Sequence, residues 1–290
     1  MQALTTRVGG LPTRYLAAGD GPPVVLVHGV GESAFDWRGA MAHLSRARRV
    51  YAPDMPAVGG TGRPATGAAM GAATGDFSPA YHARFLGAFL DALGIERAAA
   101  VVGASLHGHS VLRFALLEPH RASAVGVVGG TGLGREVNPL TLPTVLPGWG
   151  ELATGWAKTP SGAAQRAWGR VPLLFADPSR VPEGWICEQV RLARLAGFLE
   201  AQLAAARSQF GPFGQRETVL DDLPGLPMPV LLVWGGRDRV LPVRHARDAA
   251  ARLRKGRLEI LPDCGHAAWL ERPERFAGLL DGFLDEPERV

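Results

Sequence analysis

Three residues that together could activate a serine hydroxyl occur in similar local settings along this chain. Ser105 directly follows the apolar run 98–104 and precedes a helical pattern. Asp238 and His266 each follow a later apolar run, in loops that contain glycine. A serine hydroxyl is a weak nucleophile at neutral pH until a histidine accepts its proton, and a carboxylate orients that histidine. The order Ser, Asp, His therefore predicts a catalytic triad.

The residues around Ser105 read Gly103-Ala104-Ser105-Leu106-His107-Gly108. A residue between a strand end and a helix start is forced into a strained backbone, which small neighbours permit. The common pattern for such a turn is G-x-S-x-G, and here His107 stands at the second glycine position, with glycine one residue later. On a helix, the side chain two positions after Ser105 points away from it, so we interpret His107 as structural.

A second glycine-containing turn lies near the N-terminus, where an apolar run ends in His28-Gly29-Val30-Gly31. Glycines let the backbone direct its N–H groups toward a neighbouring oxygen. We expect Val30 and Leu106 to supply the two N–H donors of an oxyanion hole, each worth about 3 kcal/mol in a transition state. Gly29 is expected to contact the substrate, and His28 to hold the loop.

The other candidate ligands and bases have simpler interpretations. His43, His82, His120 and His245 lie in or beside helical patterns and are expected on the surface. The two cysteines, Cys187 and Cys264, are far apart and share no spacing with a ligand cluster. We therefore expect neither a metal site nor a disulfide.

The elements that must position these residues follow from the alternation of short Val/Leu-rich runs with helical patterns. This alternation predicts an α/β fold with a mostly parallel, doubly wound sheet. The expected strands are 24–28, 49–54, 98–104, 124–128, 230–234 and 258–261. The expected helices are 37–46, 79–93, 106–117, 243–254 and 273–284. Loops at the carboxyl ends of parallel strands share one edge, where Ser105, Asp238 and His266 are expected to meet.

The alternation breaks once, because no Val-rich run occurs between about 132 and 216. That segment reads as helices and turns, and leucines at helical spacing predict one long helix over 184–208. We predict a core of 1–131 and 216–290 with a helical insertion of 132–215. The Gly/Ala/Thr-rich stretch 59–75 is expected to be a mobile surface loop.

Composition and charge exclude several classes of protein. The 290 residues carry a net charge of +4, and the arginines are scattered rather than gathered on one predicted face, so no nucleic-acid partner is expected. No run reaches the roughly 18 apolar residues that a membrane span needs. Residues 1–20 lack the pattern of a secretory signal, so a cytoplasmic protein is expected. Monomer and dimer both stay open.

Five motifs in this order resemble the α/β-hydrolase superfamily. They are His-Gly-Val-Gly at 28–31, Asp-Met-Pro-Ala-Val-Gly at 54–59, Gly-Ala-Ser-Leu-His-Gly at 103–108, Trp-Gly-Gly-Arg-Asp at 234–238 and Cys-Gly-His at 264–266. The resemblance implies an α/β-hydrolase fold with Ser105 as nucleophile, Asp238 as acid and His266 as base. It also implies that 132–215 is a cap over the site and that no metal or organic cofactor is needed.

The substrate expected on these grounds is a small hydrophobic ester or lactone. Trp149, Trp185 and Trp269 are expected beside Gly29 in its binding site, although the aromatic residues of 132–215 could instead form that segment's own core. Two alternatives stay open. The chain also resembles hydrolases that cut carbon–carbon bonds in diketone-type ring-fission products, and it could be a ligand-binding member of the fold without catalysis.

Overall fold

The apolar runs of the sequence form the centre of one eight-stranded sheet. In the computed structural model, which describes residues 1–64 and 76–286, the strand order is β1-β2-β4-β3-β5-β6-β9-β10. The parallel part comprises β3 (Pro23–Val27), β4 (Arg49–Pro53), β5 (Ala100–Ala104), β6 (Val125–Val128), β9 (Val230–Gly235) and β10 (Gly256–Leu261). These are the six expected strands, with ends shifted by at most two residues. The predicted fold class is confirmed.

The sheet has two further strands that the sequence did not predict. β1 (Gln2–Val8) and β2 (Leu11–Ala18) form a hairpin, and β2 also pairs antiparallel with β4. Gly9 and Gly10 both have positive φ, which fits a two-residue hairpin turn. Threonine and arginine interrupt these strands, so neither forms the Val-rich run typical of a buried parallel strand.

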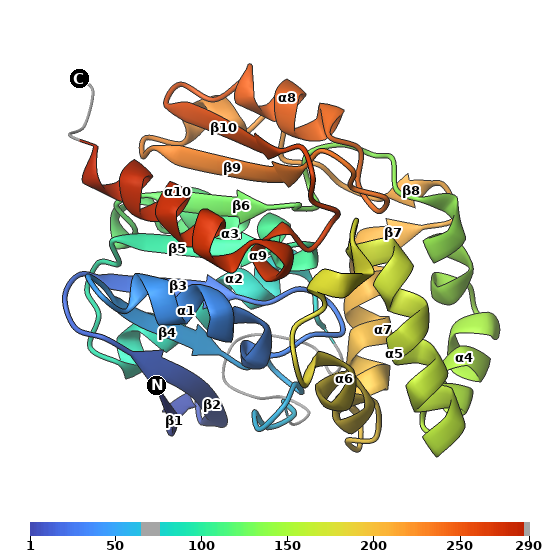
Figure 1. Cartoon of the computed structure of the whole chain (residues 1–290). Coiled ribbons are helices and arrows are strands. Elements are labelled where there is room, and N and C mark those ends of the chain that lie inside the picture. Colours follow the sequence, from blue (N-terminus) through green and yellow to red (C-terminus); the bar gives the residue numbers. More distant parts are fainter. Residues whose placement is uncertain (65–75, 287–290) are drawn as a thin grey trace.

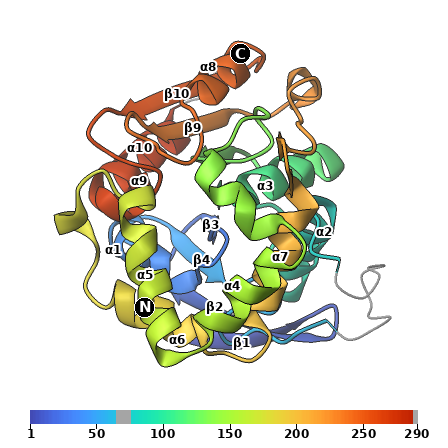
Figure 2. The same ribbon diagram turned by 90° about the vertical axis from the view of Figure 1, so that its right-hand side faces the viewer.

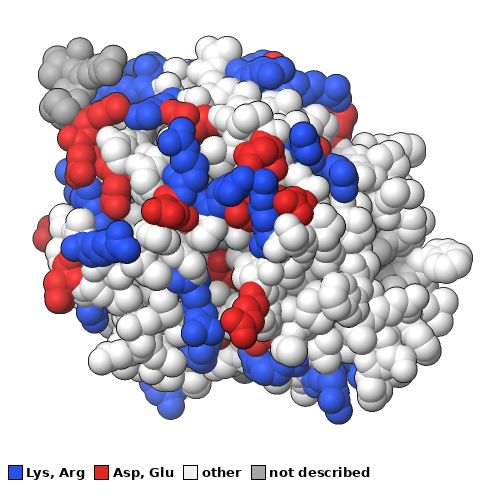
Figure 3. Space-filling view, viewed as in Figure 1, with Lys and Arg blue, Asp and Glu red and all other residues white. Residues whose placement is uncertain are grey.

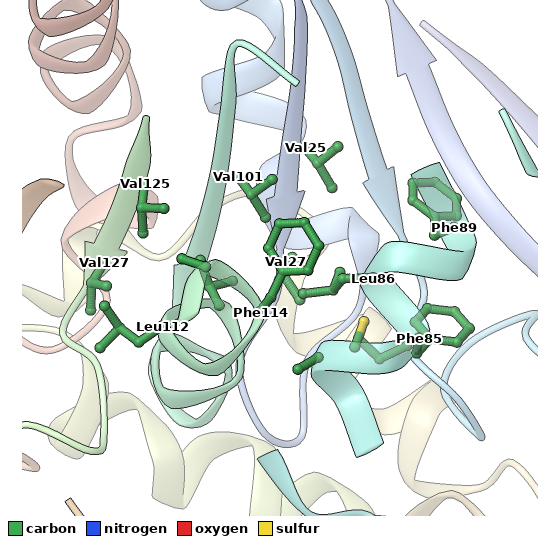
Figure 4. Packing of buried hydrophobic residues seen from close by; sticks show 14 of the residues in the cluster. Val25, Val27, Phe85, Leu86, Phe89, Val101, Leu112, Phe114, Val125 and Val127 are labelled. Carbon is green, nitrogen blue, oxygen red and sulfur yellow. The ribbon is translucent and has the colours of Figure 1, made fainter. Parts of the chain in front are cut away.

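Helices cover both faces of the sheet, as the alternation predicted (Figure 1). Val25, Val27 and Val101 pack with α2 (Pro79–Ala92) and α3 (Leu106–Leu117), and Figure 4 shows these valines pointing toward the aromatic rings of the two helices. Their neighbours in sequence point to the opposite face, because successive side chains alternate along a strand. That face packs against α1 (Arg38–Leu44) and α10 (Pro273–Asp285). α8 (Arg244–Ala250) is the fifth expected helix, and it packs on the same face as α2 and α3.

The chain between β6 and β9 is mostly helical. It contains η3 (Pro139–Val145), α4 (Trp149–Ala157), α5 (Pro160–Leu174), α6 (Trp185–Ala193), α7 (Phe198–Gln209) and the short strands β7 (Phe210–Gly211) and β8 (Gly214–Gln215). We call α4–α7 the cap helices. They lie beyond the carboxyl ends of the parallel strands, and Figure 2 views the molecule from their side. The boundaries at 132 and 215 stay a prediction.

The single long helix expected over 184–208 is wrong. It is two helices, α6 and α7, and the chain turns between them. Gly197 precedes α7 with a φ of 77°, a left-handed conformation that glycine adopts at low cost. The leucine spacing continues across the break, so the periodicity alone did not reveal it.

Part of the loop expected at 59–75 lies outside the described residues, namely 65–75. Within the described ranges, every helix is too short or too polar to span a bilayer. On the face that Figure 3 shows, Lys and Arg are interleaved with Asp and Glu, and charged residues are sparse over the cap helices.

Candidate active site

Ser105 occupies the sharp turn between β5 and α3. Its φ of 49° and ψ of −122° place a non-glycine residue in a strained backbone region. Two glycines make the turn possible. A Cβ on Gly103 would lie 2.4 Å from the His107 carbonyl oxygen, and one on Gly108 would lie 2.7 Å from Gly130 Cα. Gly108 therefore provides the close packing of α3 against the loop after β6.

The structure brings the three predicted residues into one hydrogen-bonded chain. The Ser105 hydroxyl lies 2.9 Å from His266 Nε2, and His266 Nδ1 lies 2.9 Å from Asp238 Oδ2. The other oxygen of Asp238 accepts the backbone N–H groups of Val240 and Leu241, at 2.7 and 2.9 Å. Since Asp238 can only accept, His266 carries its proton on Nδ1, and Nε2 is free to accept the serine proton.

Charge around His266 sets its affinity for a proton. Burial alone would lower the pKa of His266, but the Asp238 carboxylate and its hydrogen bond outweigh burial and raise that pKa above its usual 6.5. The side chain of His266 is almost completely buried, and that of Asp238 is fully buried. Asp238 is thus placed to stabilise a proton taken up by His266.

The glycine turn after β3 lies directly against Ser105. A Cβ on Gly29 would lie 2.9 Å from Ser105 Cβ. The Gly29 N–H donates to Glu32 Oε2 at 2.7 Å, and the Gly31 N–H donates to Gln202 Oε1 at 2.5 Å. Val30 lies between them and lines the cavity beside Ser105.

The two expected donor groups have no acceptor in the part of the chain that the structure describes. No hydrogen bond involves the Val30 N–H. Leu106 is the first residue of α3, so its N–H has no intrahelical partner, and it points from a helix N-terminus. Leu106 also lines the cavity. Both N–H groups are available to an oxygen beside Ser105.

His107 fills the position of the usual second glycine and packs into the core. Its Nδ1–H donates to the His28 carbonyl oxygen, and its ring contacts the rings of His28 and His82. His28 in turn donates from Nδ1 to Gly29 O at 2.8 Å and accepts the Met55 N–H at Nε2 at 3.1 Å. His107 and His28 thus fix the backbone of the glycine turn.

These histidines are neutral. Burial lowers the pKa of His28 to about 4 and that of His107 to about 3. Burial, together with His107 and His28, holds the pKa of His82 well below its usual value. The expectation that His82 and His245 lie on the surface is wrong, because both are 2% exposed. His82 packs on His107, and His245 Nε2 lies 2.7 Å from Glu136 Oε2.

A cavity of about 490 Å³ opens above Ser105 and His266, and both residues line it. Its walls are mainly apolar and come largely from the segment between β6 and β9. They include Leu142, Val145, Trp156, Leu173 and Leu203. Such a cavity fits an organic molecule with a sizeable hydrocarbon part.

The tryptophans expected at the binding site lie elsewhere. Trp185 and Trp269 are fully buried in the core and do not line the cavity, and Trp149 is 66% exposed and does not line it either. Trp156 is the tryptophan in the cavity wall. Gly29 touches Ser105 but is not part of the wall.

Three charged residues of the cavity were not singled out from the sequence. Glu32, Arg166 and Arg170 all line it. Arg166 and Arg170 are four residues apart on α5, a spacing that is also typical of a solvated helix face. No sequence signal separates the two cases. Within residues 1–64 and 76–286, no group of three or more His, Cys, Asp or Glu is arranged to hold a metal ion.

Comparisons with known proteins agree with this geometry. A family model described as alpha/beta hydrolase fold matches residues 22–273. A 2-hydroxy-6-oxo-2,4-heptadienoate hydrolase from Pseudomonas putida is 31% identical over 285 residues, which cover 95% of this chain and 94% of that protein.

Solved structures give the same result. A serine hydrolase involved in carbazole degradation is 26% identical, with a TM-score of 0.79 and 98% of each chain covered. A carboxylesterase from Bacillus subtilis is 21% identical, with a TM-score of 0.75, over 98% of this chain and 91% of its own, and it shares the fold.

Proposed function

This chain belongs to the α/β-hydrolase fold family and is a hydrolase, and we propose that it cleaves a carboxylic ester or lactone with a hydrophobic acyl part. The observation that carries this proposal is the hydrogen-bonded chain Ser105–His266–Asp238 beneath a mainly apolar cavity. An attacking serine needs both a base and a bound carbonyl group close by. The apolar walls supply the binding energy for the acyl part.

The proposed reaction has two steps. Ser105 Oγ attacks the carbonyl carbon while His266 Nε2 takes the hydroxyl proton, and Asp238 stabilises the resulting imidazolium. The N–H groups of Val30 and Leu106 bind the oxyanion of the tetrahedral intermediate. The C–O bond to the leaving alcohol then breaks, and His266 returns its proton to that alcohol. Water, deprotonated by His266, hydrolyses the acyl-enzyme and regenerates Ser105.

A second candidate is hydrolysis of a carbon–carbon bond in a diketone-type ring-fission product. It is supported by the 31% identity to the heptadienoate hydrolase, because that similarity covers almost the full length of both proteins. The same triad would serve, but the leaving group would be a carbanion that must be protonated at carbon. The substrate panel below includes this class.

The test measures base consumption at constant pH with short and long acyl esters, several lactones and a vinylogous diketone. We expect turnover of esters or lactones that Ser105→Ala abolishes. Ser110→Ala is the matched control, because Ser110 lies within α3, five residues after Ser105, and its hydroxyl has no hydrogen-bond partner in the described part of the chain. Cleavage of the diketone alone would favour the second candidate. Undiminished ester turnover by Ser105→Ala would contradict the proposal.

A further inference from the structure

Two guanidinium groups lie side by side in the wall of the cavity, next to Gly31. Arg166 and Arg170 are one turn apart on α5, and both line the cavity with Ser105. Both also touch the glycine turn. A Cβ on Gly31 would lie 2.5 Å from Arg166 Nη2 and 2.8 Å from Arg170 Nη1.

The two arginines differ in their partners. Arg170 donates hydrogen bonds to the carbonyl oxygens of Gly31, at 2.6 Å, and Val30, at 3.0 Å. It also donates a hydrogen bond to the side chain of Gln189, and it lies 3.6 Å from Glu32 Oε1. Its role is to hold the glycine turn.

Among the described residues, Arg166 donates only to Gln189 Oε1, at 3.4 Å. No carboxylate of the described residues lies within 4.0 Å of Arg166. An arginine is always charged and carries five N–H donors, so most donors of Arg166 have no protein acceptor. This cation at the cavity is available to a ligand.

Neither nearby acid forms an ion pair with Arg166 in the part of the chain that the structure describes. Glu32 is shared between Arg170 and the Gly29 N–H, and burial raises its pKa although Arg170 opposes that effect. Asp36 is buried, and neither of its carboxylate oxygens has a hydrogen-bond partner within residues 1–64 and 76–286. Burial together with Glu32 raises its pKa well above the usual value. Burial and the neighbouring Arg170 lower the pKa of Arg166 to about 9. Burial and Arg170 thus both disfavour the charged form of Arg166, and an anionic ligand bound to its guanidinium would stabilise that form.

The glycine turn fixes how far this cation lies from the serine. Gly29 lies against Ser105 and Gly31 against Arg166, and two residues of chain span at most about 7 Å. A molecule of several carbon atoms could therefore reach from a carbonyl at Ser105 to the guanidinium of Arg166. The apolar walls would take the hydrocarbon between its two ends.

On the premise of the proposed function of Ser105, we propose that Arg166 binds an ionised carboxylate of the substrate. The preferred substrates are then esters or lactones that carry a second, free carboxylate several carbon atoms from the scissile carbonyl. A guanidinium binds a carboxylate through two parallel hydrogen bonds, so Arg166 would select this group by shape and by charge.

The test compares mono-p-nitrophenyl esters of glutaric, adipic and suberic acid with the same esters whose far carboxyl group is methylated. We expect the wild-type protein to prefer the free acid of at least one length by roughly 10- to 100-fold in kcat/KM. Arg166→Gln should remove this preference, and Arg166→Lys should retain part of it. The control is Arg194→Gln, which removes an exposed arginine at the end of α6 that does not line the cavity. A preference that is absent in the wild type, or unchanged in Arg166→Gln, would overturn the proposal.

A binding measurement separates this proposal from the proposed function. Titration calorimetry follows glutarate, adipate and suberate binding to Ser105→Ala and to the double variant with Arg166→Gln. If no ester is cleaved but a dicarboxylate binds only while Arg166 is present, the proposed function fails and the carboxylate site stands. If both forms of every ester are cleaved equally and no dicarboxylate binds, the carboxylate site fails alone.

Discussion

At the scale of single residues, the chemistry depends on one buried hydrogen-bonded pair, Asp238 and His266. The side chain of Asp238 is fully buried, accepts hydrogen bonds from two backbone N–H groups and accepts the Nδ1–H of His266. The backbone donors fix the carboxylate, and the carboxylate fixes the tautomer of the imidazole. His266 can therefore act as a base only through Nε2, the atom that faces Ser105.

We predict that Asp238→Asn lowers kcat/KM by about 10⁴-fold, as in other triads that lose this carboxylate. The pKa of His266 is raised in the wild type, and the base is inactive when protonated. Activity should therefore be lost as the pH falls, with a midpoint above 6.5. Without the carboxylate that pKa falls, so the acidic limb of kcat/KM against pH should move to lower pH. Asp248→Asn, an exposed change on α8, is the control, and an unmoved limb would contradict this role of Asp238.

Buried neutral histidines make the stability depend on pH. The pKa of His107 is near 6.5 in the unfolded chain, whereas burial lowers it to about 3 in the folded protein. The folded state therefore loses stability as the pH falls below 6.5, by about 2 kcal/mol between pH 7 and pH 5 for this residue.

We predict that the loss of unfolding free energy between pH 7 and pH 5 is smaller in His107→Asn by about that amount. Asparagine keeps an N–H donor for the His28 carbonyl oxygen. Urea unfolding at both pH values measures the difference, with the exposed His120→Asn as control. An equal loss in wild type and His107→Asn would show that His107 titrates in the folded protein as it does in the unfolded chain.

The sequence predicted the triad because its three residues share one signal, a loop at the carboxyl end of an apolar strand. The same reasoning did not identify Arg166, since a charged residue on a helix has the same pattern whether it faces water or a cavity. Trp185 and Trp269 were assigned to the binding site by residue type alone. Tryptophan is equally suited to a core, and the structure buries both.

At the scale of elements, close approach between α3 and the loop after β6 holds Ser105 in place. Gly108 allows this approach, because any side chain there would meet the backbone of Gly130. Gly169 lies in the interior of α5, where a Cβ would meet nothing within 4 Å. The two glycines are both helical, so they offer a matched comparison.

We predict opposite effects of alanine at these positions. Gly169→Ala should raise the free energy of unfolding by about 0.5–1 kcal/mol, because alanine favours a helix. Gly108→Ala gains the same propensity but must displace α3, and should lower the unfolding free energy by about 1–3 kcal/mol. Chemical denaturation measures both. Stabilisation by Gly108→Ala would mean that α3 has room to move.

The sequence predicted the strands and helices of the core because each is a stretch of apolar residues with the length or spacing typical of a strand or a helix, bounded by turn residues. The hairpin β1–β2 was missed because its polar residues are typical of a sheet edge with one solvated face. The break before α7 was missed because α6 ends at Ala193 and Gly197 precedes α7 without any change in the leucine spacing on either side. The first error concerns one side of the sheet and the second the cap helices, and neither concerns the carboxyl ends of the strands that carry the triad.

At the scale of the whole molecule, the cap helices share their apolar core with the sheet domain. Leu192, Phe198 and Leu199 belong to the cluster built around β3, β5 and α2. Phe175 and Trp185 belong to the cluster on the opposite face, which also contains Trp269. Neither cluster is complete without residues from both parts of the chain.

We therefore predict that cap and core unfold in one cooperative transition. Tryptophan fluorescence and far-ultraviolet circular dichroism should give the same midpoint in urea. Four of the seven tryptophans lie in the segment between β6 and β9, so fluorescence reports strongly on the cap. A fluorescence change that precedes the loss of helix signal would show a cap that unfolds independently.

The most direct test of the central claim is to trap the acyl-enzyme. The protein is mixed with an excess of a p-nitrophenyl ester of a medium-chain acid, quenched in acid within the first turnovers, and mapped by mass spectrometry. We predict one acyl group per chain on the peptide that contains Ser105, and none in Ser105→Ala. An acyl group on another residue, or hydrolysis of the ester by Ser105→Ala at the wild-type rate, would contradict the assignment of Ser105 as the nucleophile.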